Sequence, residues 1–421
     1  MSGLSRIFRR ARLVGAEDRL VDIAVADGRI AEVASSIASE APSEDLGGRL
    51  VLPGFVETHV HLDKSCLLDR CGHAPVVQQA IAAVSAAKRG FTVEDVYARG
   101  SITLEKSILQ GTTRMRTHVE VDPRAGLRSF EAVRKLKADY AWAIDLQICV
   151  FPQEGLLNDP GTEELLIESL EAGADLIGGC PYTDTDPKGH IARIFEIAKR
   201  FDVDIDFHLD MHLDPARGDL AEVCRQAREH GYGGRVAVGH VNTLSAMDEP
   251  ALTAASKMMA DSGVALTVLP ATDLFLVGRD RDHLHPRAVA PAHRAWRRGV
   301  TCSVSTNNVL NPFTPFGDCS LIRMANLYAN VAQLGSLEDL RLCFDLVTSQ
   351  PARLMNLSDY GIAAGRPADL VVVDAQSAAM AIAELAPPLF ALKNGRRTFS
   401  RAPAVLHAPS AKDAALVMTG T

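Results

Sequence analysis

A nine-residue stretch near the start of the chain, ETHVHLDKS, combines several residues that could do chemistry. It contains two histidines, His59 and His61, with Lys64 three residues further on. Residues two apart in an extended strand project to the same side, so both imidazoles could bind one metal ion. Taken alone, the stretch could equally be a polar strand end that happens to be rich in histidine.

Similar polar residues follow apolar, strand-like runs later in the chain. His208 lies near the end of VDIDFHLD, His240 lies in RVAVGHVN, and Asn307 and Asn308 end VTCSVSTNN. A single buried histidine is more often a hydrogen-bonded structural residue than a metal ligand. Four histidines at the same end of three strands instead favour one shared divalent metal centre.

Eight strand-like runs carry these residues and alternate with amphipathic helical stretches. The runs are FVETHVHL, TRMRTHVEV, WAIDLQICVF, DLIGGCP, VDIDFHLD, RVAVGHVN, VALTVLPA and VTCSVSTN. Parallel strands need crossovers that cover the sheet, so this alternation predicts a closed (β/α)8 barrel. Functional residues of such barrels gather at the C-terminal ends of the strands, where these polar residues lie.

Both ends of the chain contain short extended runs that lie outside this alternation. They are FRRARLV and LVDIAVADGRIAEVA near the N-terminus, and GRPADLVVVDA and PPLFALKNGRRTFS near the C-terminus. We expect residues 1–52 and 357–421 to form one small β-sandwich domain, and residues 53–356 to form the barrel.

The composition excludes several classes of partner. The 421 residues are 47% hydrophobic and 23% charged, as in globular proteins with a substantial core. A formal net charge of -8 argues against nucleic acid or an anionic membrane surface, because both attract clustered positive charge. No run approaches the roughly 20 apolar residues of a membrane span, and no apolar signal region follows the basic N-terminus. We therefore expect a cytoplasmic protein with a small-molecule partner.

Several segments together resemble the cytosine deaminase branch of the amidohydrolase superfamily. They are PGFVETHVHLDKS, RTHVEVD, DLQICVFPQEG, VGHVNTL, NPFTPFGD and MNLSDYGIAAGRPADLVVVDA, in the same order over nearly the whole chain. The resemblance implies a barrel of the metal-dependent hydrolase type that forms a homo-oligomer and acts on a small nitrogen heterocycle. It also implies one divalent metal ion, zinc or iron, with manganese as an alternative.

The resemblance assigns roles to individual residues. His59, His61 and His208 match the metal ligands of the family. Asn307 stands where the family has a fourth ligand, an aspartate, and could bind metal weakly through its amide oxygen. His240 matches the histidine that positions the attacking water or stabilises the tetrahedral oxygen.

Two positions depart from the cytosine deaminases. Met211 replaces a glutamate that moves protons in those enzymes, and Asn307 replaces the aspartate that accepts a proton from the attacking water. Neither replacement can carry a proton, so cytosine is not the expected substrate. The N-isopropylammelide isopropylaminohydrolases of the same branch also lack the glutamate and carry a lysine at the position of Lys64. Catalytic roles are therefore expected for Lys64, His240 and Asn307, with Asp210 as another candidate proton carrier.

The expected substrate-binding residues are Gln153, Asp210, Met211, Asn308 and Phe313. Gln153 matches a residue of the family that contacts the amide edge of the substrate ring. The loss of one carboxylate makes the site more positive by one charge, which favours an anionic substrate.

The predicted reaction is metal-dependent hydrolysis at an sp2 carbon of a small nitrogen heterocycle, of the deaminase or cyclic amidohydrolase type. Two alternatives stay open at this point. One is a barrel that binds a heterocyclic metabolite without hydrolysing it, and the other is a metal-independent lyase or isomerase.

Overall fold

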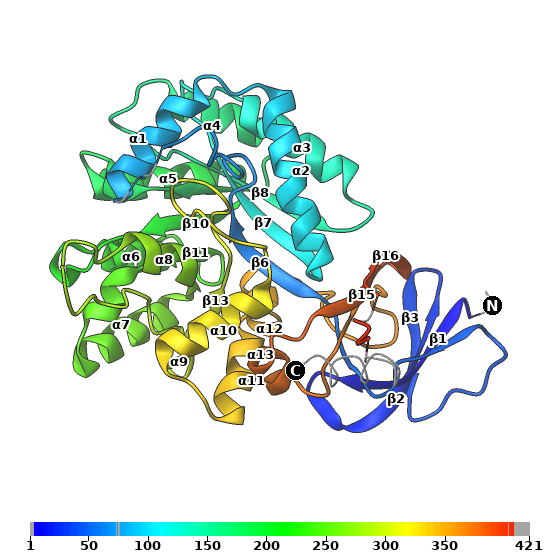
Figure 1. Ribbon diagram of the computed structural model, residues 1–421. Coiled ribbons are helices and arrows are strands. Elements are labelled where there is room, and N and C mark those ends of the chain that lie inside the picture. The colour runs from blue at the N-terminus through cyan, green and yellow to red at the C-terminus, as the bar shows by residue number, and fades with distance from the viewer. Residues whose placement is uncertain (1–3, 73, 75, 403, 408–421) are drawn as a thin grey trace, which may run out of the picture.

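Eight parallel strands form the central sheet of the computed structural model, which describes residues 4–72, 74, 76–402 and 404–407 (Figure 1). Neighbouring strands along the sheet are also consecutive in sequence. The strands are β6 (Phe55–Val60), β7 (Thr112–Glu120), β8 (Asp145–Phe151), β9 (Leu176–Gly179), β10 (Asp204–Leu209), β11 (Val236–His240), β12 (Val264–Val268) and β13 (Cys302–Val304). Each of the eight predicted runs overlaps one of these strands. Most of their residues are buried on both faces, as is typical of parallel strands covered by helices.

Backbone contacts of Asn307 close the sheet into a barrel. Asn307 forms a parallel bridge with Val60 of β6. Its N–H donates to the carbonyl oxygen of His59 at 2.8 Å, and its carbonyl oxygen accepts from the N–H of His61 at 3.0 Å. The barrel therefore closes beside the two histidines of the opening stretch.

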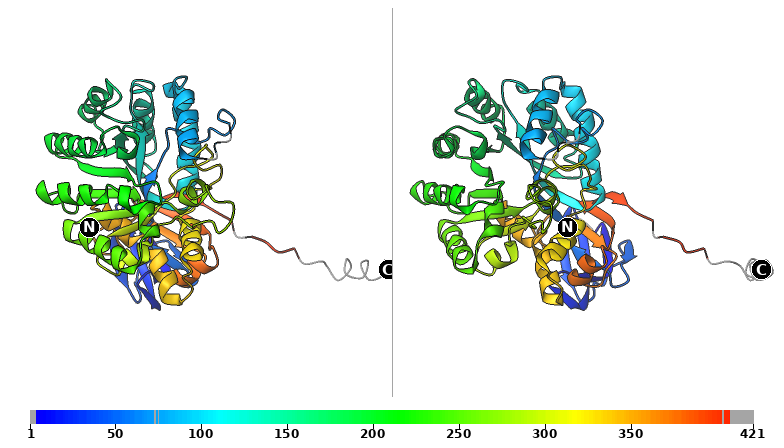
Figure 2. Two further views of the ribbon diagram at one scale, coloured as in Figure 1. Left: turned by 90° about the vertical axis from the view of Figure 1, so that its left-hand side faces the viewer. Right: turned by 60° about the vertical axis from the view of Figure 1, so that its left-hand side comes forward.

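Helices surround this barrel, and both views of Figure 2 show them on the outside of the strands. They are α1 (Val77–Lys88), α2 (Val93–Leu109), α3 (Arg128–Asp139), α4 (Thr162–Glu171), α5 (Pro187–Phe201), α6 (Leu220–Glu229), α7 (Glu249–Ser262), α8 (Pro270–Leu276), α9 (Ala292–Trp296), α10 (Leu321–Ala332), α11 (Leu337–Asp345) and α12 (Ser349–Leu354). Short 3-10 helices follow three of the strand ends, namely η1 (Pro181–Thr183), η2 (Pro215–Arg217) and η3 (Asn242–Ala246). Within the described residues, no helix has the length and apolar character needed to cross a membrane.

A second sheet combines strands from the two ends of the chain. Its strands are β1 (Arg6–Leu13), β2 (Ala16–Ala26), β3 (Arg29–Ala34), β4 (Ser43–Asp45), β5 (Leu50–Leu52), β14 (Leu370–Val373), β15 (Pro388–Lys393) and β16 (Arg396–Ser400). The two ends meet where β5 pairs antiparallel with β14. The predicted fold class, a barrel with a small β-structure built from both termini, is confirmed.

The boundaries between the two parts, at residues 52/53 and 356/357, stay predictions. Only Pro53 and Gly54 separate β5 from the first barrel strand, β6. The C-terminal part also contains helix α13 (Ala378–Ala383), which packs against the barrel helices α10 and α11. Residues 1–3, 403 and 408–421 of the predicted small domain lie outside the described residues.

A cluster of buried ion pairs connects the barrel to the second sheet. The carboxylate of Asp369 lies 2.6 Å from Arg114 of β7 and 2.7 Å from Lys393 of β15. Burial alone would raise the pKa of the Asp369 carboxyl, but Lys393 and Arg114 hold it below its usual range. The folded state is therefore stabilised by the ionised form of Asp369.

Replacing Asp369 with asparagine is expected to lower the free energy of unfolding by about 3–5 kcal/mol at pH 7, because two buried cations lose a shared partner. The difference from wild type should persist above about pH 4, near the pKa of an unfolded aspartate, and disappear as the pH falls through the lower folded-state pKa. Urea unfolding at several pH values measures both effects. The control Asp374→Asn removes an exposed pair with Arg49 and should cost less than about 1 kcal/mol. Equal losses in the two variants would contradict the prediction.

Candidate metal centre

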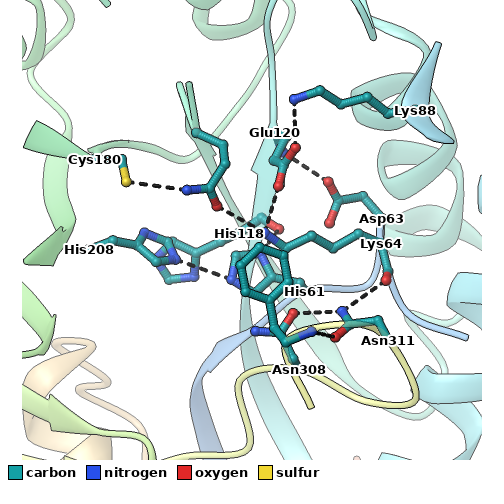
Figure 3. Close-up of polar contacts among 12 residues, drawn as sticks. His61, Asp63, Lys64, Lys88, His118, Glu120, Cys180, His208, Asn308 and Asn311 are labelled. Carbon is teal, nitrogen blue, oxygen red and sulfur yellow. Dashed lines mark hydrogen bonds and ion pairs between the residues drawn. The ribbon is translucent and has the colours of Figure 1, made fainter. Parts of the chain in front are cut away.

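Three imidazole rings converge at the C-terminal end of the barrel, where Figure 3 shows two of them with their neighbours. The Nε2 atom of His208, from β10, lies 3.0 Å from Nε2 of His59 and 3.1 Å from Nε2 of His61. His208, His59 and His61 are 3%, 0% and 1% exposed, respectively, so all three rings are buried. The predicted metal-ligand histidines therefore meet at one point.

The chemistry of these nitrogens fits a divalent metal ion. Nδ1 of His61 donates to the carbonyl oxygen of His118 at 3.2 Å, which leaves a lone pair on its Nε2. Burial, followed by electrostatic interactions with neighbouring histidines and, for His61 and His208, with Lys64, lowers the pKa of all three histidines well below the usual value. The rings are therefore neutral, which is the form that binds metals. Ligands about 2.0–2.1 Å from a tetrahedral ion lie roughly 3.3 Å apart, close to the observed spacing.

The close packing around His59 depends on neighbouring residues of other strands. A side chain at Gly239 of β11 would place its Cβ atom 3.1 Å from the His59 ring, so the missing side chain makes room for the imidazole. On its other side, His59 stacks on His118 of β7, with ring centroids 3.8 Å apart. Nε2 of His118 lies 3.5 Å from Asp206, which also pairs with Arg116 at 2.8 Å. Packing against Gly239 on one side and His118 on the other therefore fixes the position of the His59 ring.

His240 is oriented by an aspartate from the next strand connection. Its Nδ1 lies 2.6 Å from Oδ1 of Asp273, a buried residue in α8. A carboxylate can only accept from the ring, so Nδ1 carries a proton and Nε2 is directed toward the other side of the ring. Nε2 lies 3.5 Å from Nδ2 of Asn307. The position of Asp273 just after the seventh barrel strand is a usable sequence signal, because functional residues gather at this end of such barrels.

The asparagines after strand β13 form a chain of hydrogen bonds. Nδ2 of Asn308 donates to Oδ1 of Asn307 at 2.9 Å, and Nδ2 of Asn311 donates to Oδ1 of Asn308 at 2.7 Å. Asn311 also donates to the backbone carbonyl of Lys64 at 3.0 Å. Metal binding by the Asn307 amide oxygen stays a prediction. Asn311, which sequence reasoning missed, joins this loop to the opening stretch.

Lys64 is almost fully buried and lines the same cavity as the predicted metal ligands His61 and His208. Its Nζ atom donates to Oε1 of Glu120 at 2.6 Å and to Oε1 of Gln153 at 3.1 Å, as Figure 3 shows for Glu120. The same Nζ lies 4.6 Å from the centroid of the Phe313 ring, a distance at which a cation and an aromatic ring attract. Gln153 in turn donates to Sγ of Cys180 at 3.3 Å. Glu120, at the end of β7, is a partner that sequence reasoning missed.

Most of the predicted site residues line one small cavity. The predicted residues in its wall are His61, Lys64, Gln153, His208, Met211, His240, Asn307, Asn308 and Phe313, and Tyr182 and Thr272 complete it. The cavity volume is about 10 Å³, which is room for about one water molecule. His59 does not line the cavity itself, but its Nε2 atom lies 3.0 Å from Nε2 of His208, which does.

Asp210, predicted to bind substrate or carry a proton, is not among the cavity-lining residues. Its carboxylate accepts from the N–H of Asp219 at 2.8 Å and from the hydroxyl of Thr243 at 3.3 Å. Both contacts connect loops at the edge of the barrel. The Asp210 carboxylate therefore contacts the surrounding loops, and its predicted roles in substrate binding and proton transfer stay predictions.

An outer pocket adjoins this cavity. Its volume is about 720 Å³, and Tyr182 and Met211 belong to the walls of both spaces. The Tyr182 hydroxyl lies 3.8 Å from Sδ of Met211, so these two side chains form the partition. Glu154, His212 and Arg217 supply charged and polar groups on the outer side.

Comparison with known proteins matches residues 77–399 to a model of the amidohydrolase family. The chain belongs to the amidohydrolase family. It is therefore a hydrolase of carbon–nitrogen bonds, and the metal-dependent type agrees with the histidine cluster of residues 59, 61 and 208. The predicted enzyme class is confirmed.

Several relatives of this amidohydrolase are similar over most of their length. It is 30% identical over 402 residues to the N-isopropylammelide isopropyl amidohydrolase of Pseudomonas sp. (strain ADP), covering 93% of this chain and 96% of that one. It is 28% identical over 367 residues to the pterin deaminase of Rhizobium rhizogenes, covering 84% and 82%. The crystal structure of 5-methylcytosine deaminase from Klebsiella pneumoniae liganded with 5-fluorocytosine superposes with a TM-score of 0.91 at 28% identity, covering 96% and 99%.

Proposed function

We propose that this amidohydrolase removes an exocyclic amino group, by hydrolysis, from a small nitrogen heterocycle. The observation that supports this most strongly is that Nε2 of His59 and Nε2 of His61 both lie within 3.1 Å of Nε2 of His208 in a buried site. The names of similar enzymes support the choice of an exocyclic amine, because two are deaminases, of pterin and of 5-methylcytosine, and a third is an N-isopropylammelide isopropylaminohydrolase. Release of a ring nitrogen is the other form of the predicted reaction.

The three histidines would hold one divalent ion, zinc or iron, with manganese as an alternative. Asn307 would supply a weak fourth ligand through its amide oxygen. Such an ion, when bound, lowers the pKa of a coordinated water to near ~7 and polarises the carbon under attack. The histidines contribute neutral nitrogens, which bind a divalent ion without repelling it.

Proton transfer is assigned to two side chains of the cavity wall. Nε2 of His240 can accept a proton from the attacking water, and Asp273 stabilises the charged ring that results. Lys64 gives a proton to the leaving amine as the carbon–nitrogen bond breaks and the carbon–oxygen bond forms. Lys64 is preferred to Asp210 as the proton donor because Lys64 lines the cavity and the Asp210 carboxylate contacts the loops.

Three further residues would hold the substrate ring once the partition formed by Tyr182 and Met211 moves, because the cavity now has room for about one water. Gln153 is placed to contact its amide edge, and Met211 and Phe313 offer apolar surface for its faces. Glu120 offsets the positive charge of Lys64, so any preference for an anionic substrate would come from the metal ion.

A hydrolysis screen of the metal-loaded protein tests this function. The compounds are aminotriazines, aminopyrimidines, pterins, hydantoins and cyclic imides, with release of ammonia or alkylamine measured alongside bound metal. Amine release with about one metal ion per chain is the expected result. Bound metal without turnover of any compound would favour a barrel that binds a heterocycle without hydrolysing it. A protein that retains no metal after loading and dialysis would overturn the metal-dependent mechanism.

The substitution Asn307→Asp is expected to increase metal retention and to raise hydrolysis of aminopyrimidines by about 10-fold or more. The new carboxylate would add a charged metal ligand and a proton acceptor beside His240. Metal analysis after dialysis and initial-rate measurements test the two effects separately. Asn330→Asp makes the same chemical change on an exposed part of α10 and serves as the control. The same metal content and rate in both variants would contradict the assignment of Asn307.

A further inference from the structure

Lys64 is the inner end of a chain of charged side chains that leads away from the cavity. Its Nζ atom contacts one oxygen of Glu120 at 2.6 Å, and the other Glu120 oxygen accepts from Nζ of Lys88 at 2.8 Å. Lys88, the last residue of α1, also donates to a carboxylate oxygen of Glu154 at 2.5 Å and to Asp122. Figure 3 shows the part of the chain formed by Lys64, Glu120 and Lys88.

The other end of the chain reaches the outer pocket. The side chains of Lys64, Glu120 and Lys88 are 2%, 2% and 1% exposed, whereas that of Glu154 is 12% exposed and lines the outer pocket. Hydrogen bonds are therefore continuous from the metal-site cavity to a space of about 720 Å³. The route does not pass through the partition formed by Tyr182 and Met211.

Lys88 occupies a position that a metal ion would otherwise suit. The carboxylates of Glu120, Asp122 and Glu154 bring oxygen atoms within 4.8 Å of one another, and the Lys88 ammonium contacts all three. The three carboxylates share two ammonium groups, those of Lys88 and Lys64, so the cluster carries excess negative charge, which favours retention of an additional proton. The cluster can therefore store a proton as well as bind Lys88.

Among the three carboxyls of this cluster, Glu154 holds the additional proton most easily. Burial, followed by repulsion from Glu120, raises the pKa of the Glu154 carboxyl to about 7. Burial would also raise the pKa of Asp122, but Lys88 and a hydrogen bond from Glu154 lower it to about 2. The charged groups that act on Glu154 include Glu120, Lys88 and Asp122, together with Arg124. Glu154 can therefore take up or release a proton near neutral pH.

We propose that Glu154, Lys88 and Glu120 transfer protons between the outer pocket and Lys64. This role rests on the proposed function, in which Lys64 gives a proton to the leaving amine. To restore Lys64, Glu154 gives a proton to Lys88 as Lys88 gives one to the ionised carboxylate of Glu120. The Glu120 carboxyl then turns and gives this proton to the neutral amine of Lys64. Glu154 then takes a proton from water in the outer pocket, so the cluster returns to its starting charge. None of these three residues touches the substrate, and each acts through Lys64.

The test compares wild-type holoenzyme with Glu154→Gln, which keeps the shape of the side chain and removes its ionisation. We expect kcat to fall about 10-fold in dilute buffer, below the 10²–10⁴-fold effect typical of a group that transfers a proton directly. KM and bound metal should stay unchanged. Small buffer acids such as imidazolium should restore kcat by entering the outer pocket, and Glu154→Asp should retain more activity than the glutamine variant.

The control is Glu229→Gln, which changes an exposed glutamate at the end of α6. Its rate, pH profile and buffer dependence should match the wild type. Isotope-edited infrared spectroscopy gives a measurement without turnover, because the signal of protonated carboxyls that titrates near pH 7 should be smaller in Glu154→Gln than in the wild type, where Glu57 contributes as well.

Two results would count against the transfer path in different ways. An active wild type whose pH profile and buffer dependence are unchanged by Glu154→Gln would overturn the path and leave the proposed function in place. A metal-loaded wild type that hydrolyses none of the tested heterocycles would overturn the proposed function, and the path would fall with it.

Discussion

Replacing His61 with alanine is expected to empty the metal site and to lower kcat/KM by more than about 100-fold. Loss of an outer partner of a metal ligand already costs about 10–100-fold, and His61 supplies a nitrogen at the centre of the site. The two histidines that remain, His59 and His208, would offer too few ligands to retain the ion. Metal content after dialysis and steady-state kinetics on the best substrate of the screen measure the two effects.

The matched control is His230→Ala, which removes a half-buried histidine at the end of α6, whose ring bonds Gln226. This variant should retain about one metal ion per chain and near-normal turnover. Retention of metal and activity by the His61 variant would show that the ligand assignment is wrong. Loss of both in the two variants alike would indicate general damage to the barrel instead.

Replacing Lys64 with methionine is expected to lower kcat by about 10²–10⁴-fold while the metal ion stays bound, because the leaving amine loses its proton donor. The same change should also lower the free energy of unfolding by about 3 kcal/mol, since Glu120 loses one of its two buried cation partners. Steady-state kinetics, metal analysis and urea unfolding separate these effects.

A second variant distinguishes catalysis from stability. Changing Glu120 to glutamine together with Lys64→Met removes the carboxylate that has lost Lys64 as a partner, so stability should recover in part while kcat stays low. Recovery of kcat with stability would show that Lys64 only maintains the fold. Lys64→Arg keeps a cation that does not release its proton near neutral pH, and it should restore stability more than turnover.

The barrel strands could be predicted because each is a short apolar run bounded by polar residues and followed by a helical pattern. The shared direction of His59, near the end of β6, and His61, just after β6, could also be predicted. In extended backbone, side chains two residues apart lie on the same face. His208 and His240 needed only the additional rule that functional residues collect at one end of the barrel. These inferences depend on local sequence alone.

Other parts of the site depend on contacts between residues far apart in sequence. Lys88 comes from the end of an amphipathic helix, where a lysine is usually exposed, yet it meets Glu120 and Glu154 in the interior. The pairing of His240 with Asp273 also joins two different strand connections. A sequence pattern within one segment cannot reveal such partners.

Asp210 illustrates a limit of strand periodicity. It lies two residues after His208, so a continuous strand would direct both side chains into the cavity. The strand ends at Leu209, and Asp210 adopts a left-handed backbone with φ of 50°. This turn breaks the alternation of side chains, and the Asp210 carboxylate contacts the loops.

Asn307 combines barrel closure with a position beside His240. Its backbone is left-handed, with φ of 66°, a conformation that asparagine and aspartate adopt more readily than most residues. Exchange between these two amino acids therefore replaces an amide by a carboxylate while the strand junction keeps its shape. One position of this fold can thus change the charge of the reaction centre, and possible substrates with it, at little conformational cost.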